Sequence, residues 1–301
     1  MDPSRYHRPV LAETIVELFR TVGGGPVIDA TYGGGGHSRL LAADGHRVIA
    51  FDRDPDVPPP PPGVELVARP FGELGPTLDD LGVDAIAGAL FDLGVSSHQL
   101  DTPDRGFSYR HPGPLDMRMD RSGPLSAATI VNEWNEAEIA RVLSRHGDER
   151  FARRIAAAIV AARPLHDTVA LAEVVRLAIP AATRRSGGHP ARRTFQALRM
   201  AVNDEPGEFE RGLDAALDRL APGGRCVVIS YHSHEDRHTK RRFAEETRGC
   251  VCPPEQPVCT CGRTPSALAI TRKPIRADAD EVAANPRARS AILRAIERVA
   301  A

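Results

Sequence analysis

Two acidic residues stand at the ends of two successive apolar runs, and a run of glycines follows the first of them. Residues 27–37 read Val-Ile-Asp-Ala-Thr-Tyr-Gly-Gly-Gly-Gly-His, and the second acid, Asp52, directly follows Phe51. Glycine adopts positive φ angles and lets backbone N–H groups approach a ligand that a Cβ atom would keep away. The positive end of a following helix would face the same place, and an acid ending the second strand can accept hydrogen bonds from ribose hydroxyls. These residues therefore predict a site for a nucleotide-like cofactor.

The spacing of the glycines distinguishes between nucleotide cofactors. The dinucleotide pattern G-x-G-x-x-G fails because Ser38 occupies the sixth position from Gly33, and the chain has no G-x-x-x-x-G-K-[ST] loop. An NAD-dependent oxidoreductase is therefore disfavoured. The pattern that does fit is Asp29-x-x-x-Gly33-x-Gly35. It resembles motif I of S-adenosylmethionine-dependent methyltransferases, and Asp52 matches their ribose-binding acid. That cofactor has no pyrophosphate, so the missing third glycine does not count against it; a glycine-rich turn without a ligand is the alternative.

Further polar residues follow a later apolar run. Phe91-Asp92-Leu-Gly-Val-Ser96-Ser97 ends that run with an acid, a glycine and two hydroxyls. Because ligands bind at the carboxyl ends of the strands in an open α/β sheet, Asp92, Ser96 and Ser97 are candidate catalytic residues. The alternative is local: the acid would cap the next turn and the serines would bond nearby backbone groups. The two earlier acids at strand ends favour the active-site interpretation.

The elements that must position these residues are short apolar runs. Several are unbroken and rich in Val and Ile, as expected of strands covered on both faces, and helical stretches separate the first of them. This alternation predicts an α/β fold built on a doubly wound parallel sheet. The runs lie at residues 27–30, 47–51, 64–67, 85–91, 225–230 and 268–271.

The middle of the chain has a different pattern from its two ends. Helical periodicity dominates from about 125 to 198 without a convincing strand. A helix at 209–220 then ends at Pro222-Gly223-Gly224, just before the fifth strand. We therefore expect an all-helical domain inserted between the fourth and fifth strands. The expected bounds are 116–199 for the helical domain, and 1–115 with 200–301 for the cofactor-binding domain.

Composition narrows the class of protein. At 301 residues, the chain is longer than most single domains. It has no run of eighteen apolar residues, and its first residues lack the apolar segment of a signal peptide, so we expect a cytoplasmic protein without a membrane association. The net charge is −1, and only Lys240 and Lys273 are lysines among 39 basic residues. Overall charge therefore does not indicate nucleic-acid binding, and only local clusters can.

Two local clusters have the charge needed to contact phosphates. The first spans 184–193 and contains Arg192 and Arg193; the second spans 237–242. Arginine and lysine contacts to phosphate supply affinity without sequence information. A solvated helix face is the alternative for each cluster.

Four of the five cysteines form two close pairs, Cys250-Val-Cys252 and Cys259-Thr-Cys261, with six residues between the pairs. Two such pairs in one loop have the number of thiolates that a tetrahedral zinc site requires, although C-x-C is less usual than C-x-x-C. Free thiols in a reducing compartment and a disulfide formed by oxidation are the alternatives, and the spacing does not choose among them. Any metal here would be structural; we expect none in the active site.

Short blocks along nearly the whole chain carry a closer resemblance. They are residues 6–11, 35–38, 52–55, 92–101, 105–108, 115–120, 193–199, 202–204, 230–233, 271–274 and 285–290. Together they resemble the MraW (RsmH) family. The resemblance implies a Rossmann-like class I methyltransferase fold and a cytoplasmic bacterial enzyme. It also implies the reaction: transfer of a methyl group from S-adenosylmethionine to the exocyclic N4 of one cytidine in 16S rRNA, at the decoding centre of the small ribosomal subunit.

The resemblance also implies a role for individual residues. Taken alone, Phe71 would be a core aromatic, His37 a helix-start residue and Gln99 a surface loop residue. The implied cofactor site comprises Gly35, Gly36 and His37 around the methionine moiety, Asp52 on the ribose, Phe71 beside the adenine, and Asp92 with Gln99 near the reacting end.

The implied reaction is an SN2 transfer to an amine whose lone pair is delocalised into the pyrimidine ring. A base need only accept a hydrogen bond from N4, orient the lone pair and collect the proton after attack. We expect Asp92 and the Ser96-Ser97 segment to do this, with a backbone carbonyl of the same loop as the alternative. A paired cytidine would first have to leave its stack. The rival function is a non-catalytic RNA-binding protein with a degenerate cofactor pocket.

Overall fold

The computed structural model describes residues 9–184, 188–250, 252–253 and 255–300. The first three residues of the block at 6–11 and Arg185 of the first basic cluster lie outside this range. The chain forms two compact units, one of residues 1–94 and 207–301 and the other of residues 95–206. No helix in the described ranges is long and apolar enough to cross a membrane.

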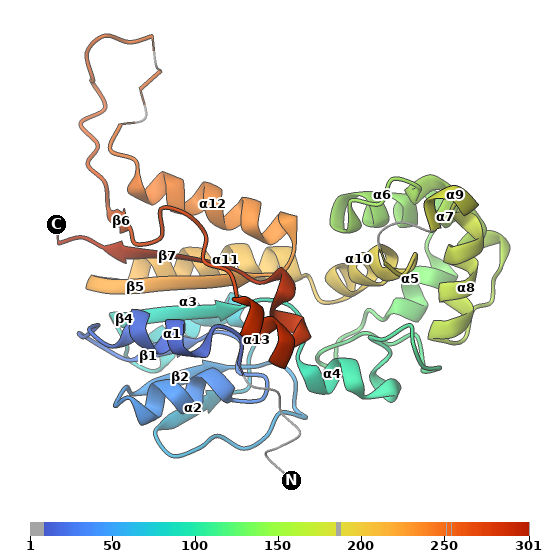
Figure 1. Ribbon diagram of the computed structural model, residues 1–301, viewed down its shortest axis with the longest axis horizontal. Helices are drawn as coiled ribbons and strands as arrows, with labels where there is room; N and C mark the ends of the chain where they lie inside the picture. The colour runs from blue at the N-terminus through green and yellow to red at the C-terminus, as the bar shows by residue number, and fades with distance from the viewer. Residues whose placement is uncertain (1–8, 185–187, 251, 254, 301) are drawn as a thin grey trace. The chain divides into compact units, whose positions relative to one another are not determined.

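A seven-stranded sheet forms the first unit (Figure 1). Its order is β3-β2-β1-β4-β5-β7-β6, in which β3 to β5 are parallel neighbours and β7 runs antiparallel to β5 and β6. The predicted fold class, an α/β fold built on a doubly wound sheet, is confirmed. The strands are β1 Val27–Asp29, β2 Val48–Phe51, β3 Val64–Val67, β4 Ile86–Asp92, β5 Leu220–Ser230, β6 Ala267–Ala269 and β7 Ile292–Arg298.

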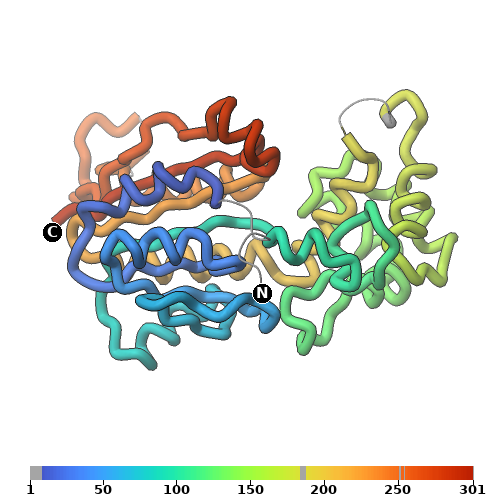
Figure 2. Tube along the Cα trace, turned by 60° about the horizontal axis from the view of Figure 1, so that its bottom comes forward, coloured from blue at the N-terminus to red at the C-terminus, as the bar shows by residue number. Residues whose placement is uncertain are grey.

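Helices cover both faces of this sheet. Successive side chains of a strand point to opposite faces, so Val27 packs with α1 and α2 while Ile28 packs with α3, α11 and α12. Figure 2 shows α1 and α2, in blue, side by side on the same face. The helices are α1 Ala12–Phe19, α2 Gly36–Ala43, α3 Leu74–Asp80, α11 Glu205–Arg219, α12 Ser233–Thr247 and α13 Ala279–Ala284.

Strand β7 is not among the strands expected from the sequence. Charged residues at 294, 297 and 298 interrupt its apolar residues, so the strand does not form an unbroken apolar run. Leu293 and Ala295 are buried, while Arg294 pairs with Asp236 at 2.7 Å. Glu297 lies opposite Arg225 of β5 in the register and forms an ion pair with it at 2.8 Å. The charged residues that interrupt the hydropathy pattern of β7 therefore form ion pairs that hold the strand against β5 and α12.

The second unit is helical. Its core contains apolar residues at helical spacing, such as Ile139 and Leu143 of α6 and Ile155 and Ile159 of α7. The sequence places the start of this unit at 116, but Val95, Leu100, Phe107 and Leu115 already pack with its core. The loop before 116 lacks helical periodicity, so its membership depends on tertiary contacts. The helices are α4 Ser97–Asp101, α5 Ala127–Glu133, α6 Glu136–Gly147, α7 Ala152–Ala161, α8 Thr168–Ala178, α9 Ala181–Arg184 and α10 Arg192–Val202.

Candidate active site

The carboxyl edge of the parallel strands gathers the predicted acids of the first unit. Asp29 ends β1, Asp52 follows β2 and Asp92 ends β4. The register places Asp29 beside Ala50 and Leu90, so the three strands end at nearly the same level. The fold thus brings together residues that are far apart in the chain at the edge where open α/β sheets bind ligands.

The glycine run forms the connection from β1 to α2. Gly33 and Gly35 both have positive φ, at 51° and 71°, and Gly35 is the N-cap of α2. A Cβ atom on Gly35 would lie 2.6 Å from the hydroxyl oxygen of Tyr32. The Gly33 N–H group donates to Oδ2 of Asp52 at 2.8 Å. Glycine is therefore required at position 35 by both backbone angle and space, and the turn is tied to the acid of the second strand.

Asp29 holds this turn from the inside. Its side chain is buried and accepts hydrogen bonds from the Ser38 hydroxyl at 2.6 Å and from the Thr31 N–H group at 3.2 Å. Burial raises the pKa of Asp29 above its usual value, although His37 and these hydrogen bonds oppose the shift. The motif acid thus connects β1 to the first turn of α2.

Asp52 is held by backbone groups on both oxygens. Its Oδ1 accepts from the Asp54 N–H group at 2.8 Å, and Oδ2 accepts from Gly33. Burial, with a contribution from the neighbouring acids, raises the pKa of Asp52 to about 6. Each carboxylate oxygen has a second lone pair, so the side chain can still accept hydrogen bonds from a diol.

Asp92 lies among three polar side chains. The Tyr231 hydroxyl donates to its Oδ1 at 2.7 Å, and the Asp92 backbone N–H donates to Thr31 Oγ1 at 2.8 Å. Nε2 of His37 is 3.5 Å from Oδ2. The Asp92 side chain is 23% exposed, whereas that of His37 is buried. This arrangement leaves a fixed, partly accessible carboxylate that can accept a hydrogen bond at the carboxyl edge.

His37 is a buried imidazole whose Nε2 lies 3.5 Å from the Asp92 carboxylate without forming a hydrogen bond of good geometry. Among the residues that the structure describes, neither ring nitrogen has a hydrogen-bond partner. Burial disfavours the charged ring, but the nearby carboxylates of Asp92 and Asp29 outweigh this effect and raise the pKa of His37 above its usual value. Because unsatisfied buried polar groups are costly, this side chain needs a partner.

Phe71 stands at the end of β3, in the short helix Phe71–Glu73. Its ring meets Phe91 edge to face, with centroids 5.8 Å apart, and Phe91 meets Phe209 at the same distance. Phe71 is only half-buried, and the Gly72 N–H group after it donates to Glu208 at 2.8 Å. It is thus the partly exposed end of an aromatic row.

Sequence reasoning missed Tyr231 and Glu235. Tyr231 directly follows β5, as Asp52 follows β2. Oε2 of Glu235 accepts from the N–H groups of Tyr231 and His232, at 2.9 and 3.1 Å, and so fixes the start of α12. The block at 230–233 includes Tyr231, but the residue type alone does not indicate an acceptor for its hydroxyl group.

Ser96, Ser97 and Gln99 belong to the second unit. Ser96 is the N-cap of α4: its Oγ accepts from the Gln99 N–H group at 3.2 Å, and the Gln99 side chain accepts from the Ser96 N–H group at 3.1 Å. Ser97 is the first residue of α4, and Gln99 is buried rather than on the surface. Ser96 therefore forms the local backbone hydrogen bond that is the alternative to a catalytic role.

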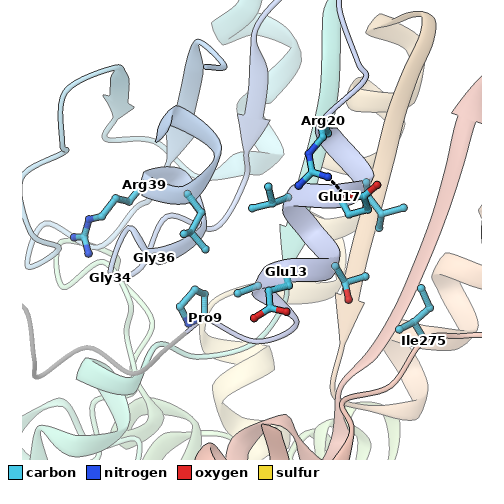
Figure 3. Close-up of a pocket in the computed structure, with 13 residues that line it drawn as sticks. Pro9, Glu13, Glu17, Arg20, Gly34, Gly36, Arg39 and Ile275 are labelled. Atoms are coloured by element: carbon cyan, nitrogen blue, oxygen red, sulfur yellow. Dashed lines mark hydrogen bonds and ion pairs between the residues drawn. The ribbon is translucent and has the colours of Figure 1, made fainter. Parts of the chain in front are cut away.

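A cavity of about 1000 Å³ opens beside α1 and α2 (Figure 3). Gly34 and Gly36 contribute to its lining, together with Pro9, Glu13 and Arg39. Asp52, Phe71 and Asp92 do not line it. The cavity therefore lies on the helical side of the glycine turn and is distinct from the group of acids.

The two basic clusters contain exposed side chains as well as one arginine that forms ion pairs within the protein. Arg192 and Arg193 are exposed in the first turn of α10, where Arg193 also donates to the Asp148 carbonyl at 3.1 Å. Arg237 and Lys240 are exposed on α12. Arg242, counted in the same cluster, instead pairs with three acids of α11 and α12, at 2.7 to 3.1 Å. It is a structural residue, so its assignment to phosphate contact is corrected.

Comparison with known proteins places the chain in one group. The model of a family described as the MraW methylase family matches residues 4–299. A protein of Symbiobacterium thermophilum named ribosomal RNA small subunit methyltransferase H is 51% identical, over 98% of each chain. Proteins of the same name from Heliobacterium modesticaldum and Geobacter sulfurreducens are 49% and 48% identical, over 98% and 97% of this chain and 99% of each relative.

Proposed function

The chain belongs to the MraW methylase family, and from this membership we propose that it methylates the exocyclic N4 of a cytidine in 16S rRNA. Transfer of a methyl group to small-subunit rRNA is the activity that the relatives' shared name describes. Beyond that activity, we propose that the base is a cytosine, that the methylated atom is N4, and that the cytidine lies at the decoding centre. The observation that carries it is the fixed Asp92 carboxylate beside the glycine turn and His37.

The cofactor of this reaction is S-adenosylmethionine, which supplies an electrophilic methyl group on a sulfonium. The turn at Gly35 and Gly36 would hold its methionine part, because the first N–H groups of α2 and a protonated His37 are donors for a carboxylate. The unsatisfied ring of His37 fits such a partner. Asp52 would accept the ribose hydroxyls, and the open edge of Phe71 would contact the adenine.

Asp92 is proposed to position the amine. The Tyr231 hydrogen bond occupies one lone pair of Oδ1 and fixes the carboxylate, which leaves Oδ2 as the acceptor for an N4–H group. Accepting this hydrogen bond turns the lone pair of N4 away from the carboxylate and prepares Asp92 to take the proton after attack. In well-oriented systems, alignment alone supplies ~7–11 kcal/mol of the barrier.

Ser96 and Ser97 remain part of the proposal, with Gln99 as a cofactor contact. The capping box already explains why Ser96 and Gln99 are present. A serine hydroxyl that accepts one bond keeps its own proton as a donor, so Ser96 can serve both purposes. Substitution of each serine by alanine, read out by cofactor affinity and turnover separately, distinguishes helix capping from chemistry.

The helical unit is proposed to bind the rRNA. Arg192 and Arg193 occupy the first turn of α10, where the helix dipole disfavours cations, so helix stability does not explain them. Phosphate contact does. Nearby, the rings of Tyr109 and His189 stack at 4.3 Å, and aromatic side chains are the usual platforms for unstacked bases.

Methyl transfer to 30S particles or naked rRNA that lack the modification tests this function. Labelled cofactor and mass spectrometry of the product nucleosides should identify N4-methylcytidine. A methyl group on another atom would overturn the assignment to cytidine N4, but the protein would still be an rRNA methyltransferase. A protein that binds rRNA but neither binds nor consumes the cofactor would instead be the non-catalytic RNA-binding protein considered above.

A further inference from the structure

The loop between α12 and β6 brings four cysteine sulfurs together. Figure 1 shows this segment, in orange, leaving the end of α12 as a long excursion beyond the sheet. The Sγ atom of Cys259 lies 3.4 Å from that of Cys250, 3.4 Å from that of Cys261 and 4.0 Å from that of Cys252. The Cys250 and Cys261 sulfurs are 3.8 Å apart, and all four lie within 4.8 Å of one another.

We propose that Cys250, Cys252, Cys259 and Cys261 bind one zinc ion as a structural four-thiolate site. Zinc–sulfur bonds of about 2.3 Å in a tetrahedron place neighbouring sulfurs about 3.8 Å apart. The four separations given above scatter around that value. A single ion at the centre of the group would therefore reach all four ligands with little movement.

The mutual arrangement of the sulfurs favours a metal over two disulfides. A disulfide joins sulfurs in exclusive pairs at about 2.05 Å. Here, Cys259 has three sulfur neighbours at similar distances, and its sulfur is 3.4 Å both from that of Cys261 in its own pair and from that of Cys250 in the other pair. None of the four cysteines forms a disulfide in the structure. This convergence on a common centre is what four ligands of one ion require.

A backbone group beside the sulfurs suits a thiolate. The Cys252 N–H group donates to the Cys250 sulfur at 3.4 Å. Such outer donors orient metal ligands and offset their negative charge. Gly262, with φ of 58°, then turns the chain directly after the last ligand.

The loop has no apolar core of its own in its described part. Most of its residues are exposed, and Val258 is 69% exposed. The C-terminal end of the loop contacts α12. There, the Ser266 N–H group donates to the Glu246 carbonyl at 3.0 Å, and the Arg263 side chain donates to the Glu245 carbonyl at 2.8 Å. A metal would replace the missing core, as in small metal-stabilised folds.

Metal analysis of the purified full-length protein tests the site. We expect one zinc per chain, released when a mercurial reagent titrates the thiols. Replacement of zinc by cobalt should give the sulfur-to-metal charge-transfer band and the strong visible bands of a tetrahedral thiolate site. Less than about a tenth of an equivalent of zinc in reduced, zinc-reconstituted protein would overturn the proposal. So would two disulfides, seen as one reactive thiol out of five in the denatured, unreduced, metal-free protein.

Variants locate the ion. Cys259→Ser with Cys261→Ser should lose the metal while circular dichroism stays unchanged, because the loop lies outside the cores of both units. Cys226→Ala is the matched control, since Cys226 is buried in β5 and should not affect metal content. Equal zinc in the double variant and the wild type would exclude these ligands. If the double variant does not fold, the cobalt spectrum of the wild type still decides.

Discussion

The hydroxyl group of Tyr231 donates a hydrogen bond of 2.7 Å to Oδ1 of Asp92. The two residues are 139 positions apart in the chain, and the parallel pairing of β4 with β5, in which Asp92 lies opposite Ile229, brings them together. The tyrosine is mostly buried, and burial together with Asp92 raises its pKa well above the usual value, so it stays a donor. The bond therefore keeps the Asp92 carboxylate in one orientation at the carboxyl edge.

Loss of this bond should slow methyl transfer without loss of the cofactor. Hydrogen bonds to charged groups contribute about 1.5–3 kcal/mol, so we expect Tyr231→Phe to lower kcat roughly tenfold. The affinity for S-adenosylmethionine, measured by calorimetry, should stay nearly constant. A double-mutant cycle with Asp92→Asn separates positioning from general damage: the two losses should not add, whereas additive losses would show that Tyr231 acts elsewhere.

Asp92→Asn should reduce turnover more strongly than Tyr231→Phe. The amide keeps the shape of the carboxylate but cannot collect a proton, and general-base contributions are typically about 10²–10⁴-fold. We expect single-turnover methylation to fall by roughly 100-fold or more, with thermal unfolding and cofactor binding close to wild type. Full turnover with normal cofactor binding would remove Asp92 from the mechanism.

Cofactor binding should weaken in acid because of Asp52. Its pKa is raised to about 6, so it is ionised at neutral pH and becomes protonated as the pH falls through that value. A protonated carboxyl is a poorer acceptor for ribose hydroxyls, and the affinity should fall up to tenfold per pH unit below the transition.

The pH experiment needs a control for His37, because protonation of its ring would also change cofactor binding. Asp92 and Asp29 raise the pKa of His37, and its protonation in acid strengthens binding of the methionine carboxylate, the opposite sign. Calorimetry between about pH 7.5 and 5 on wild type and Asp52→Asn separates the two groups. The variant should bind weakly and lose the decline in acid; an unchanged decline would assign it to another group.

Gly35→Ala should destabilise the glycine turn and the cofactor site together. The position has φ of 71°, and a Cβ atom would lie 2.6 Å from Tyr32 Oη. The left-handed conformation costs about 1–2 kcal/mol for a residue with a Cβ. Gly45→Ala is the matched control, because Gly45 also has a positive φ, 95°, but an added Cβ meets nothing within 4 Å. Both should lower the free energy of unfolding, and only Gly35→Ala should weaken cofactor affinity; equal affinities would contradict this use of the turn.

The sequence identifies site residues that end or directly follow an unbroken apolar run. It does not identify residues whose role depends on a partner that only the tertiary structure brings near. Asp29, Asp52 and Asp92 each end an apolar run, so their common edge follows from the parallel sheet. Tyr231 follows such a run too, but an aromatic residue at that point has no distinctive chemistry until its acceptor is known. The sequence does not show that Arg242 is engaged, because its partners Asp214 and Glu246 become neighbours only when two helices pack. Charge patterns alone therefore overestimate the surface open to RNA.

The salt dependence of rRNA binding tests the phosphate contacts that we propose for the helical unit. Each phosphate contact adds about 0.7–0.9 to the slope of log K against log salt concentration. Arg192→Ala with Arg193→Ala should therefore weaken binding and lower that slope by roughly 1.4–1.8. The matched control is Arg153→Ala with Arg154→Ala, which removes the same charge from two exposed neighbours on α7 of the same unit. Because Arg193 also bonds the Asp148 carbonyl, thermal unfolding must first show that the pair remains folded. Equal slopes for the two double variants would mean that the effect is one of net charge and that α10 does not contact the rRNA backbone.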